Sequence, residues 1–434
     1  MSAKLKQKIA SKSGRIAVMG LGYVGLPLAV SFARAGFSVY GLDTDQERVD
    51  RIVRKENYIG DIPDALLSRL VDRKKLTAST DLSLLQQADV VIICVPTPLK
   101  RKYTPDVSFI TKAVKTVSKH LHKNMLVVCE STTYPGTTQE LILPGLERSG
   151  LKLGRDFFLA FSPERIDPGN KKFDVTRIPK VVGGVDRRSG ELAKVLYQTI
   201  IKKIHVVSSA SAAEMTKLLE NSFRIINIGW INEVAVMCHH MGIDIWEVIE
   251  AAKTKPFGFM PFYPGLGVGG HCIPDDPLYL YWKARTYGFS SKYIKLSADI
   301  NAQMPNYVVE RVAGQLAQRD ALLSRARILV LGVTYKKDVK DLRKSPALKL
   351  MDLLQGAAQR VDYHDPLIPY LDIFRIHNKD SIELTPQAIK SYDCVIIATD
   401  HSAVDYDRLL RHARLIFDTR NVYGRSSSRK VVRL

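Results

Sequence analysis

The stretch "RIAVMGLGYVGLPLAVSFARAGFSVYGLDTD", residues 15–45, decides the fold. Its apolar run over residues 15–19 predicts a buried strand, and apolar residues at helical spacing from Leu26 to Ala35 predict a helix. A second strand-like run ends at Asp43. This order of strand, helix and strand predicts the first part of a parallel α/β sheet of the dinucleotide-binding type.

Three glycines, Gly20, Gly22 and Gly25, form a GxGxxG pattern between the predicted strand and helix. The first glycine allows the turn, the second lets the backbone approach a pyrophosphate, and the third lets the helix pack on the strand. Asp43 would accept hydrogen bonds from a ribose 2′-hydroxyl and repel a 2′-phosphate, which predicts NAD rather than NADP. The cofactor-binding residues expected from this stretch are Gly20, Gly22, Tyr23, Val24, Gly25, Asp43 and Arg48.

Three further apolar runs continue the sheet: "DVVIICVPTP" at 89–98, "MLVVCESTTYPGTT" at 125–138 and "FFLAFSPERIDPG" at 157–169. Each run ends in small, polar or proline residues, as the carboxyl ends of parallel strands do where such sheets bind ligands. We therefore expect Thr97, Thr132 and Glu164 to lie on the binding edge.

A weaker copy of the pattern lies near the C-terminus. The segments "RILVLGVTYKKDVKDLRKSPALKLMDLL" at 327–354, "RVDYHDP" and "YDCVIIATDHSAVD" repeat the order strand, turn, helix, strand and later strand. This copy keeps only Gly332 of the glycines and places Lys336, Lys337 and Arg343 after the strand. It predicts a phosphorylated ligand other than a second dinucleotide, although surface solvation alone would also explain two of these three charges.

Between the two copies, residues 209–241 are expected to form one long helix that stops at Gly242. Ser211 and Glu214 have the spacing of a capping box at its start. Lys217 and Asn221 stand four residues apart, hence on one face, where a solvated pair is the favoured interpretation from the helix alone.

The expected fold is therefore α/β, with two Rossmann-like doubly wound domains joined by a long central helix and the active cleft between them. We expect a NAD-binding domain over residues 1–207, a central helical and dimerisation segment with a catalytic loop over 208–308, and a Rossmann-like domain for the phosphorylated ligand over 309–434. The long helix is a natural homodimer surface.

Composition narrows the partners. The net charge is +20 over 434 residues, but the basic residues are spread along the chain without a zinc finger, an aromatic RNA-binding motif or a long basic run. A nucleic-acid partner is therefore not expected, and a phosphate-bearing small molecule is. No apolar run approaches the roughly 18 residues of a membrane span, so a cytoplasmic protein without membrane insertion is expected.

The five cysteines show no metal-binding spacing, so no metal site is expected. Cys94 and Cys394 lie in strand-like runs and are expected to be buried apolar residues. Cys272 is different, because it follows three glycines in "GVGGHCIPDDP", residues 267–277, where few side chains would shield it.

Six motifs carry a family resemblance: "GLGYVGLPLA", "ESTTYPGTT", "SPERIDPGN", "KLLENSFR", "GVGGHCIPDDP" and "LGVTYKKDVKDLRKSP". In this order, and spread over nearly the whole chain, they resemble the UDP-sugar 6-dehydrogenases of the UDP-glucose/GDP-mannose dehydrogenase family. The combination of "SPERIDPGN" with "GGHCIPDDPLYLYWKA" is most similar to the branch that oxidises UDP-N-acetylglucosamine.

The resemblance implies oxidation of a C6 alcohol to a carboxylate in two hydride steps with two NAD molecules, for the synthesis of surface polysaccharide precursors. Cys272 would add to the intermediate aldehyde and form a thiohemiacetal, then a thioester that water cleaves. Lys217 and Asn221 would stabilise the negatively charged oxygen. Asp276 would help to activate water, although Asp276 followed by Pro277 is also a good N-cap and N1 pair. Glu164 would position water or relay protons.

The resemblance also assigns the ends of the substrate. Tyr263 and Gly265 would pack on the uridine part, and Lys337 and Arg420 would lie near the nucleotide end. Arg343 would reach towards the cofactor, and the threonine after the third strand would be Thr132 in preference to Thr133. Arg165 departs from the apolar residue of the glucose-specific branch, which favours an N-acetylated sugar. The substrate-binding residues implied are Arg165, Lys217, Asn221, Tyr263, Gly265, Lys337 and Arg420.

Several alternatives stay open. UDP-N-acetylmannosamine and UDP-glucose are alternative substrates. An enzyme of the 3-hydroxyacid dehydrogenase type would share the NAD domain and a helix with lysine and asparagine, but it would need no cysteine. A nucleotide sensor without turnover would have no use for Cys272, Lys217, Asn221 and Asp276 together.

Overall fold

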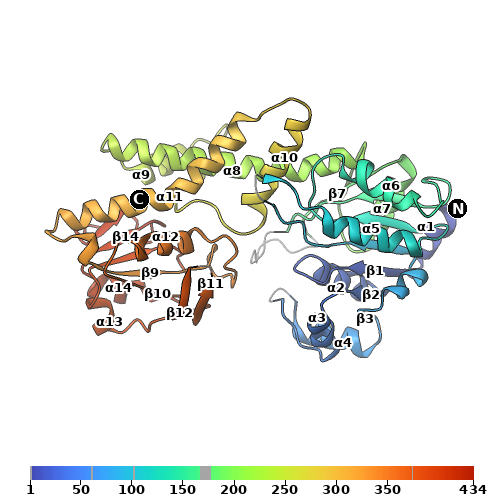
Figure 1. Cartoon of the computed structure of the whole chain (residues 1–434), viewed down its shortest axis with the longest axis horizontal. Helices are drawn as coiled ribbons and strands as arrows, with labels where there is room; N and C mark the ends of the chain where they lie inside the picture. The colour runs from blue at the N-terminus through green and yellow to red at the C-terminus, as the bar shows by residue number, and fades with distance from the viewer. Residues whose placement is uncertain (1, 60–61, 101–102, 167–176, 374) are drawn as a thin grey trace. The chain divides into compact units, whose positions relative to one another are not determined.

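The computed structural model describes residues 2–59, 62–100, 103–166, 177–373 and 375–434 (Figure 1). They form two compact units. The N-terminal unit consists of Met1–Glu220 with Trp282–Phe289, and the C-terminal unit consists of Asn221–Tyr281 with Ser290–Leu434.

The N-terminal unit is built on an eight-stranded sheet in the order β3-β2-β1-β4-β5-β6-β7-β8. Its first six positions follow the doubly wound order of dinucleotide-binding folds. All neighbouring strands are parallel except β6 and β7, which are antiparallel. The strands are β1 (Arg15–Met19), β2 (Ser38–Leu42), β3 (Leu76–Ser79), β4 (Val90–Ile93), β5 (Leu126–Cys129), β6 (Phe158–Phe161), β7 (Lys180–Gly184) and β8 (Ile204–Val207).

Both faces of this sheet are buried. On β1, Ile16 and Val18 belong to one apolar core, whereas Ala17 and Met19 belong to the other, because successive side chains of a strand point to opposite faces. The helical elements of the unit are α1 (Ser2–Ala10), α2 (Gly25–Ala35), α3 (Gln46–Val53), α4 (Asp64–Asp72), η1 (Leu82–Gln87), α5 (Ser108–His120), η3 (Thr138–Ile142), α6 (Leu143–Glu147) and α7 (Arg187–Gln198).

The C-terminal unit repeats this plan on a smaller scale. Its five parallel strands have the order β10-β9-β13-β14-β15. On β9, Ile328 and Val330 face one core and Leu329 and Leu331 face the other. The elements are α9 (Ile245–Ala252), α11 (Lys292–Ala317), η4 (Leu323–Arg325), β9 (Arg327–Leu331), α12 (Pro346–Gln355), β10 (Arg360–His364), β11 (Tyr370–Ile373), β12 (Ile376–Asp380), α13 (Pro386–Lys390), β13 (Cys394–Ile397), α14 (Tyr406–His412), β14 (Ile416–Asp418) and β15 (Val431–Arg433).

Two helices belong to both units: α8 (Ala210–His240) and α10 (Cys272–Thr286). The expected α/β architecture, with two Rossmann-like sheets and a long central helix, is confirmed. Among the described residues, no helix combines the length and apolar character that crossing a membrane requires.

The capping box predicted at the start of α8 is wrong. The Ser209 hydroxyl accepts the hydrogen bond from the Ala212 backbone N–H at 3.1 Å. The Glu214 carboxylate instead accepts hydrogen bonds from the N–H groups of Gly136 and Thr138, at 2.6 and 2.9 Å. Glu214 is fully buried, so it anchors α8 to the segment after β5 and does not satisfy its own helix end.

Candidate cofactor and catalytic sites

The glycine-rich turn after β1 is shaped by close backbone contacts. Gly20 has a φ of +93°, and a Cβ atom at Gly25 would collide with the Gly20 carbonyl. Gly22 differs, because a Cβ there would meet no atom within 4 Å. The turn therefore leaves open space above the second glycine, next to the first residue of α2, where a pyrophosphate would lie against a helix N-terminus. These residues fit NAD.

Asp43 follows the last residue of β2 and is held against this turn. Its Oδ2 accepts a hydrogen bond from the Leu21 N–H at 2.7 Å, and its Oδ1 accepts one from the Asp45 N–H at 3.0 Å. Arg48 reaches Oδ2 from α3 at 3.5 Å. A carboxylate has about four lone-pair sites, so the bonded side chain keeps acceptor capacity for ribose hydroxyls.

The other residues predicted for the cofactor within the N-terminal unit lie beside the turn or after strands of the same sheet, whereas Arg343 lies in the C-terminal unit. Tyr23 is exposed and Val24 is the N-cap residue of α2. Thr97 follows β4 and is buried. After β5, Thr132 is half-buried and Thr133 is buried.

Glu164 follows β6 and is bonded through both carboxylate oxygens. Oε1 accepts hydrogen bonds from the Arg165 and Ile166 N–H groups, and Lys180 donates to Oε2 at 3.0 Å. Burial works against ionisation of Glu164, but the Lys180 ammonium and the backbone donors outweigh it, so the pKa of Glu164 lies below its usual value. Glu164 is thus a fixed, ionised carboxylate.

Arg165 points to α8. Its guanidinium bonds Glu220 at 2.6 Å and the Pro179 carbonyl at 2.6 Å. Lys217, one turn before Glu220 on α8, is buried. The predicted sugar-contacting side chain Arg165 therefore already has protein partners within the N-terminal unit.

The C-terminal unit brings Asn221 and Asp276 together. The Asn221 side-chain amide on α8 donates to Asp276 Oδ2 on α10, and both residues are buried. Cys272 is the first residue of α10 and is exposed. Asp276 and Pro277 therefore lie inside this helix, and the alternative that they form its N-cap and N1 pair is wrong.

The glycines before Cys272 pack against the loop that follows β9. A Cβ at Gly269 would approach Tyr335 Cβ to 2.6 Å and the Lys344 carbonyl to 2.9 Å. The Gly270 N–H donates to the Arg343 carbonyl at 2.8 Å. The structure therefore gives these glycines a packing reason, which holds the cysteine-bearing segment to the C-terminal sheet.

The residues implied for the nucleotide end lie in the same unit. A Cβ at Gly265 would come within 3.1 Å of the Arg420 guanidinium, which also donates to the Ala398 carbonyl at 2.8 Å. Tyr263 stacks on Trp246 with ring centroids 6.1 Å apart. Lys337 pairs with Asp400 at 3.3 Å, and Arg343 pairs with Asp341.

Sequence reasoning missed several buried polar residues. Lys180 joins Glu164 to Glu130, and Tyr197 bonds Glu130. In the C-terminal unit, His401 bonds Asp365 at 3.1 Å. The available signal was position, since Glu130 directly follows the apolar run of β5 and Lys180 directly precedes that of β7.

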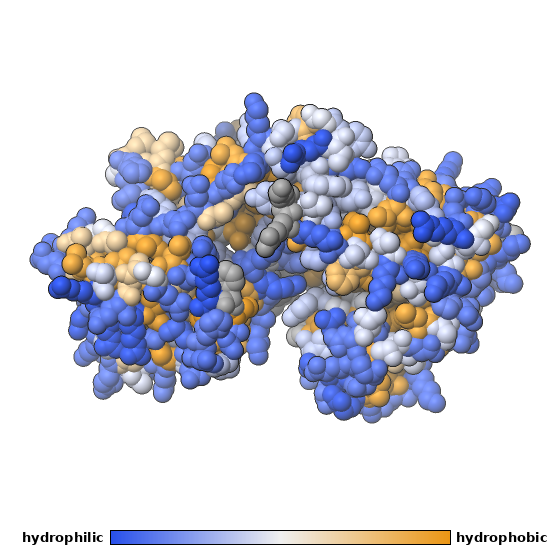
Figure 2. Space-filling model, viewed as in Figure 1, coloured by the Kyte–Doolittle hydropathy of each residue, from blue (hydrophilic) through white to orange (hydrophobic). Residues whose placement is uncertain are grey.

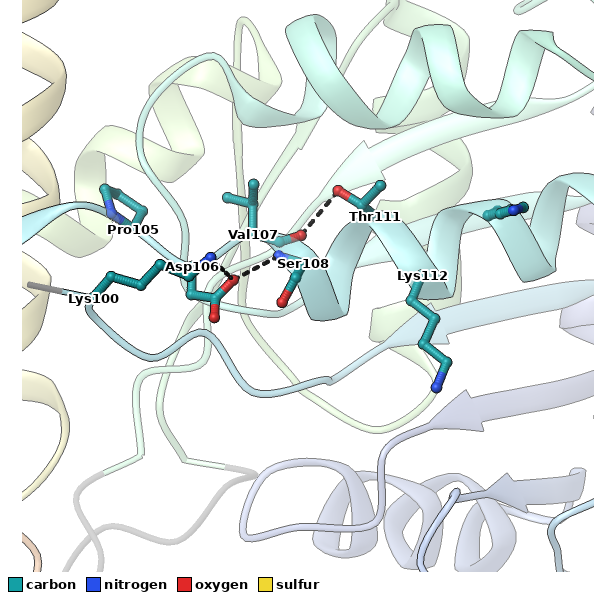
Figure 3. Close-up of a pocket in the computed structure, with 8 residues that line it drawn as sticks. Lys100, Pro105, Asp106, Val107, Ser108, Thr111 and Lys112 are labelled. Carbon is teal, nitrogen blue, oxygen red and sulfur yellow. Dashed lines mark hydrogen bonds and ion pairs between the residues drawn. The ribbon is translucent and has the colours of Figure 1, made fainter.

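Over the residues that the structure describes, neither a metal-binding cluster nor the pocket described below adds to the predicted site. In the described part of the chain, no group of three or more His, Cys, Asp or Glu side chains is placed to hold a metal ion. A shallow pocket at the N-terminus of α5 contains none of the predicted site residues (Figure 3). It is lined by Lys100, Pro105, Asp106, Val107, Ser108, Thr111, Lys112 and Lys115.

The chain matches three domains of one family. The NAD binding domain of the UDP-glucose/GDP-mannose dehydrogenase family matches residues 14–201, its central domain matches 211–303, and its UDP binding domain matches 329–425.

Relatives and solved structures agree with these matches. The chain is 35% identical to a UDP-N-acetyl-D-mannosamine dehydrogenase from Pyrococcus horikoshii, over 94% of this chain and 96% of the relative. It is 38% identical to a UDP-N-acetyl-D-glucosamine 6-dehydrogenase from Pseudomonas aeruginosa, over 90% and 91% of the two chains. A solved UDP-D-ManNAc dehydrogenase structure from Pyrococcus horikoshii superposes with a TM-score of 0.87 at 33% identity, covering 96% of this chain and 98% of that one.

Proposed function

The chain belongs to the UDP-glucose/GDP-mannose dehydrogenase family, and on that premise we propose that it oxidises the C6 hydroxymethyl group of a UDP-N-acetylhexosamine to the uronic acid. NAD is the cofactor that the family's N-terminal domain indicates. Conversion of an alcohol to a carboxylate removes four electrons, so each sugar consumes two NAD. The expected cytoplasmic location and role in polysaccharide precursor synthesis remain predictions.

One observation carries the proposal. Cys272 is exposed at the first turn of α10, and Asp276, one turn further on, is buried and bonded to Asn221 of α8. A helix N-terminus favours negative charge, which suits a thiolate. A nucleophile beside a carboxylate and an amide donor is the set of groups that a covalent acyl intermediate and its hydrolysis need.

NAD, when bound, accepts a hydride in each of the two oxidation steps. Lys217 and Asn221 stabilise the C6 oxygen as negative charge develops on it. The Cys272 thiolate adds to the aldehyde carbon, and loss of the second hydride converts this thiohemiacetal into a thioester. Water then attacks the carbonyl carbon and the C–S bond breaks, with Glu164 and Asp276 positioning the water and taking its proton.

The sugar is proposed to be N-acetylglucosamine. A relative that is 38% identical carries that substrate in its name, and the polar Arg165 suits an N-acetyl group better than an apolar residue would. N-acetylmannosamine is the alternative, because several relatives, one of them 35% identical, are named for it. UDP-glucose is less favoured, because it lacks the N-acetyl group that the polar Arg165 would suit.

Substrate comparison tests the assignment. NADH yield is measured with UDP-N-acetylglucosamine, UDP-N-acetylmannosamine, UDP-N-acetylgalactosamine and UDP-glucose at limiting sugar. We expect two NADH per sugar and the highest kcat/KM with UDP-N-acetylglucosamine. A yield of one NADH per sugar would argue against the four-electron reaction, and a preference for another sugar would replace the sugar assignment alone.

Cys272→Ser tests the covalent route. Serine keeps the size but has a much higher pKa than a thiol, so acid formation should fall by several orders of magnitude while the UDP-sugar still binds. In Glu164→Gln, a sugar bound covalently to Cys272 should accumulate and be detected by mass spectrometry of the intact protein. Wild-type acid production by Cys272→Ser would exclude the thioester.

We also propose that α8 forms a homodimer surface. Along the helix, large apolar side chains are exposed at intervals of four and seven residues, and Figure 2 shows apolar surface in the region of α8 and α9. They are Met215, Leu219, Phe223, Trp230 and Met237. Exposed apolar stripes of this kind mark protein interfaces. Light scattering should give a dimer mass for the wild type and a monomer for Trp230→Glu.

A further inference from the structure

A buried chain of four polar side chains runs through the N-terminal unit. The Tyr197 hydroxyl on α7 donates to Glu130. The Lys180 ammonium donates to Glu130 Oε2 at 2.8 Å and to Glu164 Oε2 at 3.0 Å. The three charged side chains have little contact with solvent: the exposed fraction is 4% for Lys180, 0% for Glu130 and 13% for Glu164. An uncompensated charge here would be costly.

The sheet brings these groups together. β5, β6 and β7 are adjacent, and the β6–β7 pair is antiparallel. Glu130 directly follows β5, Glu164 lies shortly after β6, and Lys180 is the first residue of β7. An antiparallel β7 therefore presents its beginning where β5 and β6 end. The reversal of direction between β6 and β7 is what brings the Lys180 ammonium to the edge that carries Glu164.

The charges in this cluster are unequal. Burial raises the pKa of Glu130, and Lys180 only partly offsets it. The pKa of Glu164 is lowered, because Lys180 and two backbone N–H donors outweigh burial. Tyr197, itself part of the cluster, and the neighbouring Cys94 and Cys129 are also titratable. Burial raises the pKa of all three far above neutrality, so they stay uncharged. Lys180 is thus the nearby cation that keeps Glu164 ionised.

We propose that Lys180 is a positioning residue for the reaction: it fixes the orientation and the negative charge of Glu164 for hydrolysis of the Cys272 thioester, and Glu130 with Tyr197 holds Lys180 in place. The inference rests on the proposed function, in which Glu164 acts on water. Because Glu164 Oε1 already accepts two backbone N–H groups and Oε2 accepts from Lys180, one lone pair of Oε2 is left to bind a water.

The kinetic test compares Lys180→Met with Lys180→Arg through the pH dependence of kcat. Loss of an opposite charge at hydrogen-bond distance raises a carboxyl pKa by about 1–3 units. The acid limb of the Lys180→Met profile should therefore move to higher pH by that amount, whereas Lys180→Arg should stay near the wild type. A residue with a purely structural role would lower kcat at every pH and leave the limb in place, which would overturn the proposal.

A second variant guards against misfolding, because Lys180→Met leaves two buried carboxylates without a counter-charge. Adding Glu130→Gln to Lys180→Met removes the other charge that repels Glu164. The acid limb of the double variant should move part of the way back towards the wild-type position. An unchanged or further raised limb in the double variant would contradict the proposed charge coupling.

A readout without turnover separates this inference from the proposed function. In protein labelled with ¹³C at the glutamate carboxyl carbons, the Glu164 signal is identified by its loss in Glu164→Gln, and its titration is followed by NMR. The titration should move upward in Lys180→Met even if the wild type were to oxidise no UDP-sugar. An unshifted Glu164 titration would overturn the inference while leaving the substrate assignment untouched.

Discussion

The two Rossmann-like halves start alike and then differ. Each has a glycine with positive φ after its first strand, Gly20 at +93° and Gly332 at +80°. In each, a Cβ at that glycine would collide with a carbonyl at the end of a neighbouring strand, that of Cys94 in the first half and of Thr399 in the second. The first glycine of the pattern is therefore a requirement of the turn in both halves, whatever the ligand.

The acidic residue after the second strand shows the divergence. Asp43 and Asp365 each accept a hydrogen bond at 2.7 Å from the residue that follows the glycine, Leu21 or Val333. Asp43 keeps some exposure at 8%, whereas Asp365 is 2% exposed and is also bonded by His401. In the second half both carboxylate oxygens accept hydrogen bonds from protein donors. The strand, turn and strand order that the halves share does not predict which ligand each binds. The hydrogen-bond acceptor capacity left at Asp43 or Asp365 is more informative.

The largest effect is expected for Gly25→Ala, since its Cβ would enter the Gly20 carbonyl and neither backbone can yield. We expect the Kd for NAD to rise at least about 100-fold, which corresponds to about 2.7 kcal/mol, measured by calorimetry. Gly314→Ala, at an open helical position of the C-terminal unit, is the matched control and should bind NAD normally. Normal NAD affinity in Gly25→Ala would show that the close contact between Gly25 and the Gly20 carbonyl is not needed for NAD binding in the first half.

Asp365→Ala should destabilise the second half and leave NAD binding unchanged. The substitution leaves the buried Val333 N–H and its neighbours without an acceptor, at about 1–3 kcal/mol for each lost partner. Urea denaturation should show the lower free energy of unfolding, with unchanged NAD affinity. Asp380→Ala, at an exposed position, serves as the control. A drop in NAD affinity instead would show that the two halves are not specialised as described.

The first half should have its own pH dependence through Glu214. Burial raises the pKa of Glu214 from the usual 4.5 to about 7. The folded state therefore binds the proton more tightly than the unfolded state, and this stabilisation is complete below pH 4.5 and lost as the pH rises through about 7. The change is expected to be on the order of 1–3 kcal/mol. Glu214→Gln should flatten this part of the pH–stability curve, whereas Glu47→Gln at an exposed site should not.

The smallest effect is expected for Asp43→Ala. The variant loses a ribose contact, so NAD affinity should fall by about tenfold, and the preference for NAD over NADP should narrow. It also removes the acceptor of the Leu21 N–H, so the free energy of unfolding should fall as well. Steady-state kinetics with both cofactors measures it. An unchanged preference would mean that a residue other than Asp43 discriminates between them.

Local patterns predicted the fold because each apolar run was bounded by clear turn residues, as at Gly20 and Gly332. Sequence spacing could not predict contacts between residues that are far apart in the chain. Ser211 and Glu214 have the capping-box spacing, yet Glu214 is claimed by backbone donors from the segment after β5. Asp276 and Pro277 look like a helix start, but the helix begins four residues earlier at Cys272.

Some residues of the candidate site could likewise be predicted from the sequence and others could not. The glycine turn and Asp43 could be predicted because they are close in sequence and obey known backbone geometry. The Lys180 bridge between Glu130 and Glu164 could not, since it depends on β7 running against β6, and no local pattern in the sequence specifies strand direction there.

The exposure of Cys272 has a practical consequence for chemical labelling. The other four cysteines are buried or half-buried, and burial raises the pKa of Cys94, Cys129 and Cys394, so these thiols react slowly with alkylating agents. A short treatment with a maleimide dye should therefore place one fluorophore per chain at the start of α10. Because Cys272 is the proposed nucleophile, the labelled protein should no longer form the acid, and the unlabelled protein would need a reductant during storage.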